Sequence, residues 1–236
     1  MYTIRFDKLE LHHNDFVLDM GCGEGRHSIG LFIDHQVNTV AFDLSLKDLN
    51  TARKRLKDFT IHETNRANCF FGVGDVHSLP FKDNFYSSVI CSEVLEHIKN
   101  PEDAIDELVR VLKPGGVLAL SVPRFLPEWI CWKLSQEYSR SPGGHVRIFK
   151  QKQLKELALK RGLLFEHSHW AHALHSPYWW LKCIFWEKRD EPWVLKKYHK
   201  FLVWDLMKKP LLTKFLEWVF QPLIGKSLVM YFIKPL

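Results

Sequence analysis

Residues 17–28, VLDMGCGEGRHS, combine one carboxylate with three closely spaced glycines. Asp19 stands two residues before Gly21, and Gly23 and Gly25 follow at every second position. Glycines adopt positive φ angles at no steric cost and let a ligand approach the bare backbone. Because apolar residues precede this loop and helix-like spacing follows it, the pattern predicts a strand, a nucleotide-binding loop and a helix.

Two further acids complete a candidate nucleoside site. Asp43 ends the apolar run NTVAFDLS, about 20 residues past the glycines, where ribose hydroxyls are held. Asp75 ends ANCFFGVGDV, where a carboxylate can accept from an adenine amine. A dinucleotide fingerprint needs a third glycine where Arg26 stands, and a pyrophosphate gains nothing from Asp19. A nucleoside with a cationic amino-acid tail suits all three acids, which predicts S-adenosylmethionine as the cofactor.

The segments that must position these acids alternate between strand-like and helix-like patterns. This alternation predicts one α/β domain over residues 1–236, a doubly wound, mostly parallel sheet of seven strands. The expected strands lie at 16–18, 38–45, 67–76, at the start of 86–98, and at 116–122, 163–170 and 227–235.

Composition limits the setting of the chain. Five scattered cysteines without a Cys-x-x-Cys pair favour a reduced, intracellular protein. The N-terminus lacks the apolar segment of a signal peptide, and no run reaches the ~18 apolar residues of a membrane span. We therefore expect a cytoplasmic protein. Its net charge of +6 permits an anionic partner without requiring one.

The order of motifs resembles that of the class I S-adenosylmethionine-dependent methyltransferases, in the methyltransferase type 11 group that contains ubiquinone-biosynthesis enzymes. The matching stretches are VLDMGCGEG, VAFDLS, GDVHSLPF, FYSSVICSEVLEHI and RVLKPGGVLALSVP, between about residues 15 and 170. The resemblance implies a Rossmann-like fold and this cofactor. In the glycine loop, Asp19 and the backbone of Gly21, Cys22 and Gly23 would hold the methionine moiety, with Gly25 also in the loop.

The same resemblance implies the remaining cofactor contacts. Asp43 would bind the ribose hydroxyls, with Leu44 against the adenine. Asp75 would meet the adenine amine, and the Val76 amide a ring nitrogen. Ser92 and Glu93 would border the methyl group.

The motif EVLEH, residues 93–97, offers candidates for catalysis. On a helix, Glu93, Glu96 and His97 would share one face and could hold a divalent ion. The group is similar to one in metal-assisted ubiquinone-type and small-RNA 2′-O-methyltransferases, where a downstream histidine, here His145, also contributes. Relatives without metal carry the same LEH residues, and we predict no metal. For a hydroxyl acceptor we expect the base to be His145 or His97, with Glu93 third.

The segment between the last two expected strands, 171–226, is too long for an unstructured loop. It holds most of the tryptophans, interleaved with lysines, and is predicted to be a helical cap. Only about 15 residues precede the first motif, so the cap would replace the N-terminal cover usual in the family. It would enclose a small apolar or lipid-linked acceptor, and 176–222 would rest on the inner face of a membrane. The lysines expected there include Lys196, Lys197, Lys200, Lys208 and Lys209. The alternative is a helical subdomain with its own core.

The run HSHWAHALHS carries four histidines, 167, 169, 172 and 175. A metal site needs convergent ligands, whereas a strand followed by a loop scatters them. We therefore predict a solvated or pH-responsive loop.

These features together predict methyl transfer by in-line displacement, with an oxygen as the favoured acceptor. Three alternatives remain. A non-catalytic, membrane-peripheral binding protein would keep the fold and the cap. A nucleic-acid methyltransferase is not expected, because the chain lacks an Asn/Asp-Pro-Pro-Tyr motif and a basic stripe. A nicotinamide dehydrogenase is disfavoured by Arg26.

Overall fold

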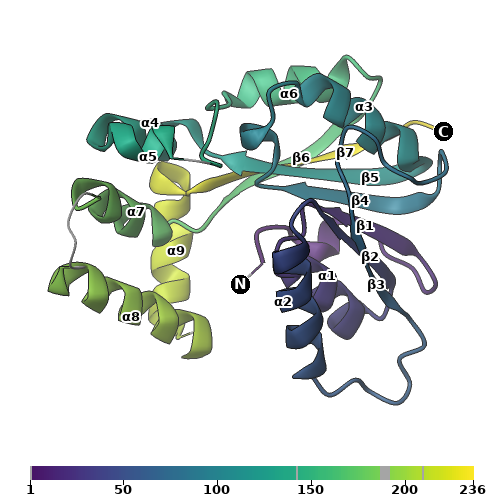
Figure 1. The fold of residues 1–236 in the computed structure, drawn as a ribbon, viewed down its shortest axis with the longest axis horizontal. Coiled ribbons are helices and arrows are strands. Elements are labelled where there is room, and N and C mark those ends of the chain that lie inside the picture. Colours follow the sequence, from purple (N-terminus) through teal and green to yellow (C-terminus); the bar gives the residue numbers. More distant parts are fainter. Residues whose placement is uncertain (1, 142, 187–191, 209) are drawn as a thin grey trace.

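The computed structural model describes residues 2–141, 143–186, 192–208 and 210–236. Seven strands form one sheet in the order β3-β2-β1-β4-β5-β7-β6 (Figure 1). Only β7 runs antiparallel to its neighbours, so the predicted mostly parallel, doubly wound sheet is confirmed. The strands are β1 Phe16–Met20, β2 Asn38–Asp43, β3 Cys69–Val73, β4 Tyr86–Ser92, β5 Leu112–Pro123, β6 Leu164–Ala171 and β7 Ser227–Ile233.

Helices cover both faces of this sheet. On one face, Ile105 and Leu108 of α3 and Leu154 of α6 are fully buried in one core with side chains of β4, β5 and β7. On the other face, the N-terminal residues Ile4 and Leu9 pack on the same strands. Alternating strands and amphipathic helices therefore bury a core on each side. The helical elements that flank the sheet are α1 Arg26–Gly30, its π-helical extension Leu31–His35, α2 Leu46–Lys57, α3 Pro101–Val111 and α6 Gln151–Leu159.

The strand order reverses between β1 and β4, which both leave the sheet at the same edge. In a doubly wound sheet this reversal opens a crevice at the carboxyl ends of the strands. The glycine loop follows β1 there. Ser45 begins α2 at the same edge, and its hydroxyl accepts from the Asp48 amide at 3.2 Å, as the sequence predicts.

Five more helices gather beyond this end of the sheet (Figure 1). Three lie between β6 and β7, namely α7 His175–Ile184, α8 Trp193–Lys208 and α9 Leu211–Ile224. The other two, α4 Phe125–Leu134 and α5 Gln136–Arg140, follow β5 directly, and α4 packs against α7. We call these five helices the cap. The sequence did not predict α4 and α5, because FLPEWICWKL is apolar almost all round and contains a proline.

Candidate functional site

The glycine loop is built around three left-handed backbone positions. Gly21, Gly23 and Gly25 have φ angles of +71°, +52° and +79°. A Cβ atom at Gly25 would lie 2.8 Å from the Ala52 Cβ, and one at Gly21 would collide with Val94. At Gly23 a Cβ would meet nothing within 4 Å. Two of the glycines are therefore required by packing, whereas Gly23 faces open space that a ligand can enter.

The amides of this loop are already used inside the protein. Gly21 N and Cys22 N donate to the Phe42 carbonyl at 2.7 and 3.3 Å, and Gly23 N donates to Asp43 Oδ2 at 2.7 Å. Phosphate-binding loops need amide donors aimed at the ligand. A loop whose donors are occupied offers mainly acceptors, which suit a cationic group and not a pyrophosphate.

Asp19 lies fully buried beneath the loop. Its Oδ2 accepts from the Ser28 amide at 3.0 Å and from the Ser28 hydroxyl at 2.5 Å, which ties β1 to α1. Its Oδ1 has no hydrogen-bond partner among the described residues. Burial raises the pKa of this carboxyl to about 6. Asp19 thus supports the loop and keeps one oxygen for a donor. The predicted contact with a cationic tail stays a prediction.

Asp43 and Asp75 stand at the ends of the neighbouring strands β2 and β3. Each Asp43 oxygen accepts one amide hydrogen, from Gly23 and from Ser45, at 2.7 Å in both cases. A carboxylate oxygen has a second lone pair, so Asp43 can still accept from ribose hydroxyls. Asp75 Oδ1 accepts from the His77 amide at 3.0 Å and lies 2.7 Å from His77 Nδ1. These two hydrogen bonds lower the pKa of Asp75. Beside these acids, Leu44 is 70% exposed and Val76 is buried.

The end of β4 differs from the predicted helix. Glu93 has a φ angle of +58°, and only Leu95–His97 form a 3-10 turn before α3. The expectation that Glu93, Glu96 and His97 share one helical face is therefore wrong. Ser92 and Ser121 hydroxyls lie 2.8 Å apart, and Ser121 donates to Glu93 Oε1 at 3.1 Å. The left-handed turn thus engages Glu93 with β5.

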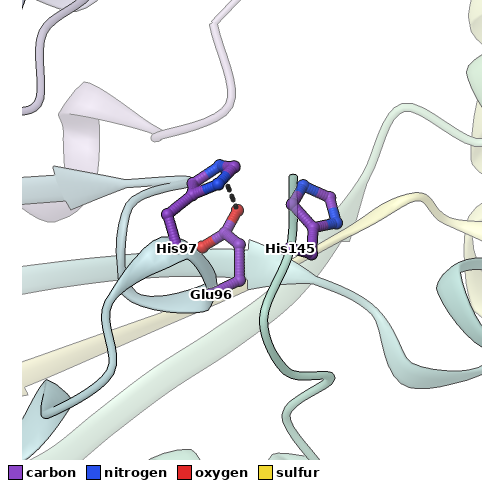
Figure 2. A group of neighbouring side chains, drawn as sticks. All are labelled: Glu96, His97 and His145. Carbon is purple, nitrogen blue, oxygen red and sulfur yellow. Dashed lines mark ion pairs between the residues drawn. The ribbon is translucent and has the colours of Figure 1, made fainter. Parts of the chain in front are cut away.

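A second group forms beside this turn. Figure 2 shows Glu96, His97 and His145, whose ligand atoms all lie within 4.8 Å of one another. Glu96 is 1% exposed, and neither of its oxygens has a hydrogen-bond partner among the described residues. Burial, reinforced by the charge of Glu93, raises the pKa of Glu96 well above its usual range. One carboxyl and two imidazoles can hold a divalent ion or pass a proton.

Both imidazoles are held through Nδ1. His97 Nδ1 lies 3.2 Å from the Gly144 carbonyl, which requires a proton on Nδ1 and leaves the lone pair on Nε2. His145 Nδ1 lies 2.6 Å from Glu128 Oε1. Glu128, on α4, is buried and also accepts from Tyr138 and Trp132. Burial alone would raise the pKa of Glu128, but the hydrogen bonds and charges of His145, Lys226 and Tyr138 together lower it.

Sequence reasoning missed Glu128, although one signal marked it. It is the only acid in the apolar helix FLPEWICWKL, and a carboxylate among such residues needs a buried partner. Glu128 fixes the His145 ring as an acid does for a catalytic imidazole. The structure therefore brings His97 and His145 together, with a ring-centroid distance of 4.9 Å, and engages Glu93 with Ser121 on β5.

A cavity of about 480 Å³ lies between the cap and the sheet. Arg26 of α1 and Glu93 after β4 line its inner side. Trp179 of α7, Leu202 of α8 and Lys226 before β7 line its outer side. The cavity therefore joins the end of β4, next to Ser92, to the aromatic helices of the cap.

The four histidines do not form a solvated loop, and that prediction is wrong. His172 is buried, has a φ angle of +64°, and its Nε2 lies 3.0 Å from the Thr3 hydroxyl. His167 and His169 belong to β6, and His175 belongs to α7. Burial lowers the pKa of His169 and of His175 to about 4, so neither ring titrates near pH 7.

The outer surface of the cap exposes large apolar side chains. Leu211 is 82% exposed and Trp218 is 72% exposed, and both belong to α9. On α8, the Lys197 ammonium lies 4.8 Å from the centre of the exposed Trp193 ring. Lys209 lies outside the described residues. Within the described ranges, no helix has the length and apolarity to cross a membrane.

Residues 18–120 match the family described as methyltransferase domain. A demethylmenaquinone methyltransferase of Renibacterium salmoninarum is 35% identical over 114 residues, which are 47% of this chain and 44% of that protein. The matched region spans less than half the length of this relative and of three other curated relatives.

Solved structures share the fold at low sequence identity. The YcgJ protein of Bacillus subtilis aligns with a TM-score of 0.65 and 19% identity, over 98% of this chain and 96% of that one. Phosphoethanolamine N-methyltransferase 2 of Haemonchus contortus, in complex with S-adenosyl-L-methionine, aligns with a TM-score of 0.62 and 19% identity. That alignment covers 96% of this chain and 50% of the Haemonchus enzyme.

Proposed function

We propose that this chain, which belongs to the class I S-adenosylmethionine-dependent methyltransferases, transfers a methyl group to a small apolar or lipid-linked acceptor, with oxygen as the favoured accepting atom. The observation that carries this proposal is the cavity between the cap and the sheet. It is lined by Glu93 beside the cofactor loop and by Trp179 and Leu202 of the cap.

The residues at the glycine loop fit the cofactor. Gly23 faces open space, Asp19 keeps one unpartnered oxygen for an ammonium group, and Asp43 keeps lone pairs for ribose hydroxyls. Leu44 and Asp75, at the ends of β2 and β3, would meet the adenine. When bound, S-adenosylmethionine supplies a methyl carbon made electrophilic by its sulfonium.

In-line displacement at such a carbon asks the protein mainly for positioning. The walls of the cavity would hold the acceptor beside the methyl group. A hydroxyl acceptor also has a proton to lose, and His145 is the first candidate to take it. Glu128 would orient the His145 ring through Nδ1. His97 and Glu93 are the further candidates.

Two observations support an apolar or lipid-linked acceptor. The cavity wall includes Trp179, Tyr178 and Leu202, which suit an apolar body. The Renibacterium relative is named for demethylmenaquinone, which makes quinones reasonable compounds to test.

The cap would also rest on a membrane surface. The exposed Leu211 and Trp218 of α9, and the lysine-flanked Trp193 of α8, give an apolar surface with cationic neighbours. This composition is typical of helices that lie in a membrane interface.

The proposal is tested by a methylation screen. The purified chain is incubated with radiolabelled S-adenosylmethionine and with total lipid, quinone and small-metabolite fractions. We expect label in one fraction with the wild type and with the control Asp103→Ala, an exposed acid on α3. Asp43→Ala should label that fraction far less. A chain that binds the cofactor by calorimetry but labels no fraction would contradict the proposed transfer.

A further inference from the structure

The cavity under the cap collects three cationic side chains from distant parts of the chain. Arg26 comes from α1, Lys182 from α7 and Lys226 from the residue before β7. Within the described ranges, none of the three forms an ion pair with an acid within 4.0 Å. Cations that gather in a cavity and are not held in direct ion pairs are suited to an anionic ligand.

Two of these cations meet at one aromatic ring. The Lys182 ammonium lies 4.7 Å from the centre of the Trp179 ring, and the Lys226 ammonium lies 5.4 Å from it. The ring attracts both groups through its negative face and so holds them in the cavity. The Lys182 and Lys226 ammonium groups, both hydrogen-bond donors, therefore lie against the same apolar ring, that of Trp179.

The other charged groups of the cavity do not cancel this positive charge. His172 and His175 are held neutral near pH 7, because burial lowers their pKa and the charge of Lys226 lowers it further. Two carboxylates also face the cavity. Glu93 accepts from Ser121, and Asp205 lies on the α8 wall at 5% exposure. Among the described residues that line the cavity, three cations therefore face two acids. Behind the lining, Arg26 also interacts electrostatically with Asp19, and Lys226 with Glu96 and Glu128, whereas Lys182 stands apart from these acids.

We infer that the acceptor carries an oxyanion, a carboxylate or a phosphate, which Lys182 and Lys226 bind while its apolar body lies against Trp179 and Leu202. This inference rests on the proposed function, because it names the class of acceptor for the same cavity. The volume of about 480 Å³ is that of a small-molecule site. The anion would lie on the cap side, which leaves the Glu93 side for the accepting atom.

Binding of four simple probes tests the inference without any turnover. Octanoate, octyl phosphate, octanol and octylamine share an apolar chain and differ only in the head group. Calorimetry on the full chain should show both anions binding at least tenfold more tightly than octanol, and octylamine more weakly still. The quenching of tryptophan fluorescence gives a second readout, which should be reduced in Trp179→Phe.

Variants separate the two lysines from the general charge of the cap. Lys182→Met and Lys226→Met keep the apolar stem and remove the charge. Each should weaken anion binding about tenfold, or 1.4 kcal/mol, and leave octanol and S-adenosylmethionine affinities unchanged. Lys200→Met, on an exposed part of α8, is the matched control and should change none of these. Circular dichroism verifies that each variant is folded.

The ratio of octanoate to octyl phosphate affinity distinguishes a carboxylate from a phosphate. If phosphatidylglycerol vesicles displace octyl phosphate, the anion belongs to a lipid head group. If the vesicles do not displace octyl phosphate, the acceptor is a soluble compound. Equal affinity for octanol and the anions, no binding of any anion, or an equal loss in Lys200→Met would overturn the inference. A failed methylation screen would not affect these binding results, so the two failures are distinguishable.

Discussion

The glycine-loop half of the molecule and the cap half are built in opposite ways. In the first half, Asp19, Asp43 and Asp75 each stand at or just beyond the end of a strand, and local backbone contacts fix them. In the cap half, the important pairs join distant segments, such as Glu128 with His145 and Lys182 with Lys226 around one ring. The residues proposed to hold the cofactor are therefore positioned by local contacts, whereas those proposed to hold the acceptor depend on long-range packing.

Removing the three cap helices between β6 and β7 should separate the two halves most strongly. A chain in which 176–222 is replaced by a glycine-serine turn should lose methyl transfer by roughly a thousandfold, because the acceptor is no longer positioned. Its S-adenosylmethionine affinity should stay within about threefold, since none of the predicted cofactor residues lies within 176–222. Calorimetry and the labelled-methyl assay measure the two effects.

The deletion removes Glu217, which accepts from the Ala173 and Leu174 amides, so circular dichroism must accompany it. Trp179→Ala is the milder variant if the deletion does not fold. If either folded variant transferred methyl groups at the full rate, the cap would have only a structural role and no role in binding the acceptor.

His145→Ala tests the proton-transfer part of the cap half. It should lower kcat for a hydroxyl acceptor about a hundredfold, the usual contribution of a positioned base, with cofactor affinity unchanged. Glu128→Gln should cost less, because the amide oxygen can still accept a hydrogen bond from His145 Nδ1 and keep the ring in place. His62→Ala, an exposed histidine, is the control. Unchanged kcat in a folded His145→Ala chain would remove His145 from the mechanism.

Asp43→Ala tests the glycine-loop half. We expect S-adenosylmethionine affinity to fall by roughly 1–3 kcal/mol, because the ribose hydroxyls lose a charged acceptor. The Gly23 and Ser45 amides also lose their partner, so the fold must be verified. Binding of the octyl probes should not change. Calorimetry that finds the cofactor affinity intact in a folded variant would contradict the assignment of Asp43.

His169 of β6 and His175 of α7 give a smaller, pH-dependent effect. His169 and His175 have pKa values of about 4 in the fold against 6.5 for a free imidazole. The unfolded chain therefore binds more protons between these pH values, so the free energy of unfolding falls as pH drops from 6.5 to 4. Their contribution is complete above pH 6.5. We expect a loss of roughly 1–3 kcal/mol, reduced in His175→Gln. Chemical denaturation at several pH values measures the free energy of unfolding. The same pH dependence in the wild type and in His175→Gln would contradict this prediction.

The smallest expected effect is that of a chelator. The left-handed turn engages Glu93 with Ser121, so only one carboxyl joins His97 and His145, and hard cations such as magnesium prefer several oxygen ligands. We expect EDTA to leave methyl transfer unchanged. Stoichiometric metal in the purified chain that disappears in Glu96→Ala would show a metal site instead.

The sequence was sufficient for the sheet and for the glycine-loop half. Glycine spacing, strand-end acids and the capping Ser45 act over a few residues, so their pattern survives in the sequence. The turn at Glu93 was predicted as a helix because EVLEH has helical spacing, and nothing local reveals a φ angle of +58°. The burial of His172 could not be predicted either, since its partner Thr3 lies 169 residues away.

The cap shows the same limit more clearly. Its helical content between β6 and β7 followed from tryptophans and lysines at helical spacing. The two helices after β5 did not, and with them Glu128 was missed. The cavity that Arg26 and Lys226 share exists only after residues 200 positions apart have packed together.

The most direct test is calorimetric titration of the full chain with S-adenosylmethionine and, separately, with NAD⁺. The central claim is that the glycine loop, whose Gly21, Cys22 and Gly23 amides bond to Phe42 and Asp43, suits a cationic nucleoside better than a pyrophosphate. We predict one S-adenosylmethionine bound per chain and no heat of binding with NAD⁺. Binding of NAD⁺, or no binding of S-adenosylmethionine to the folded chain, would contradict the claim.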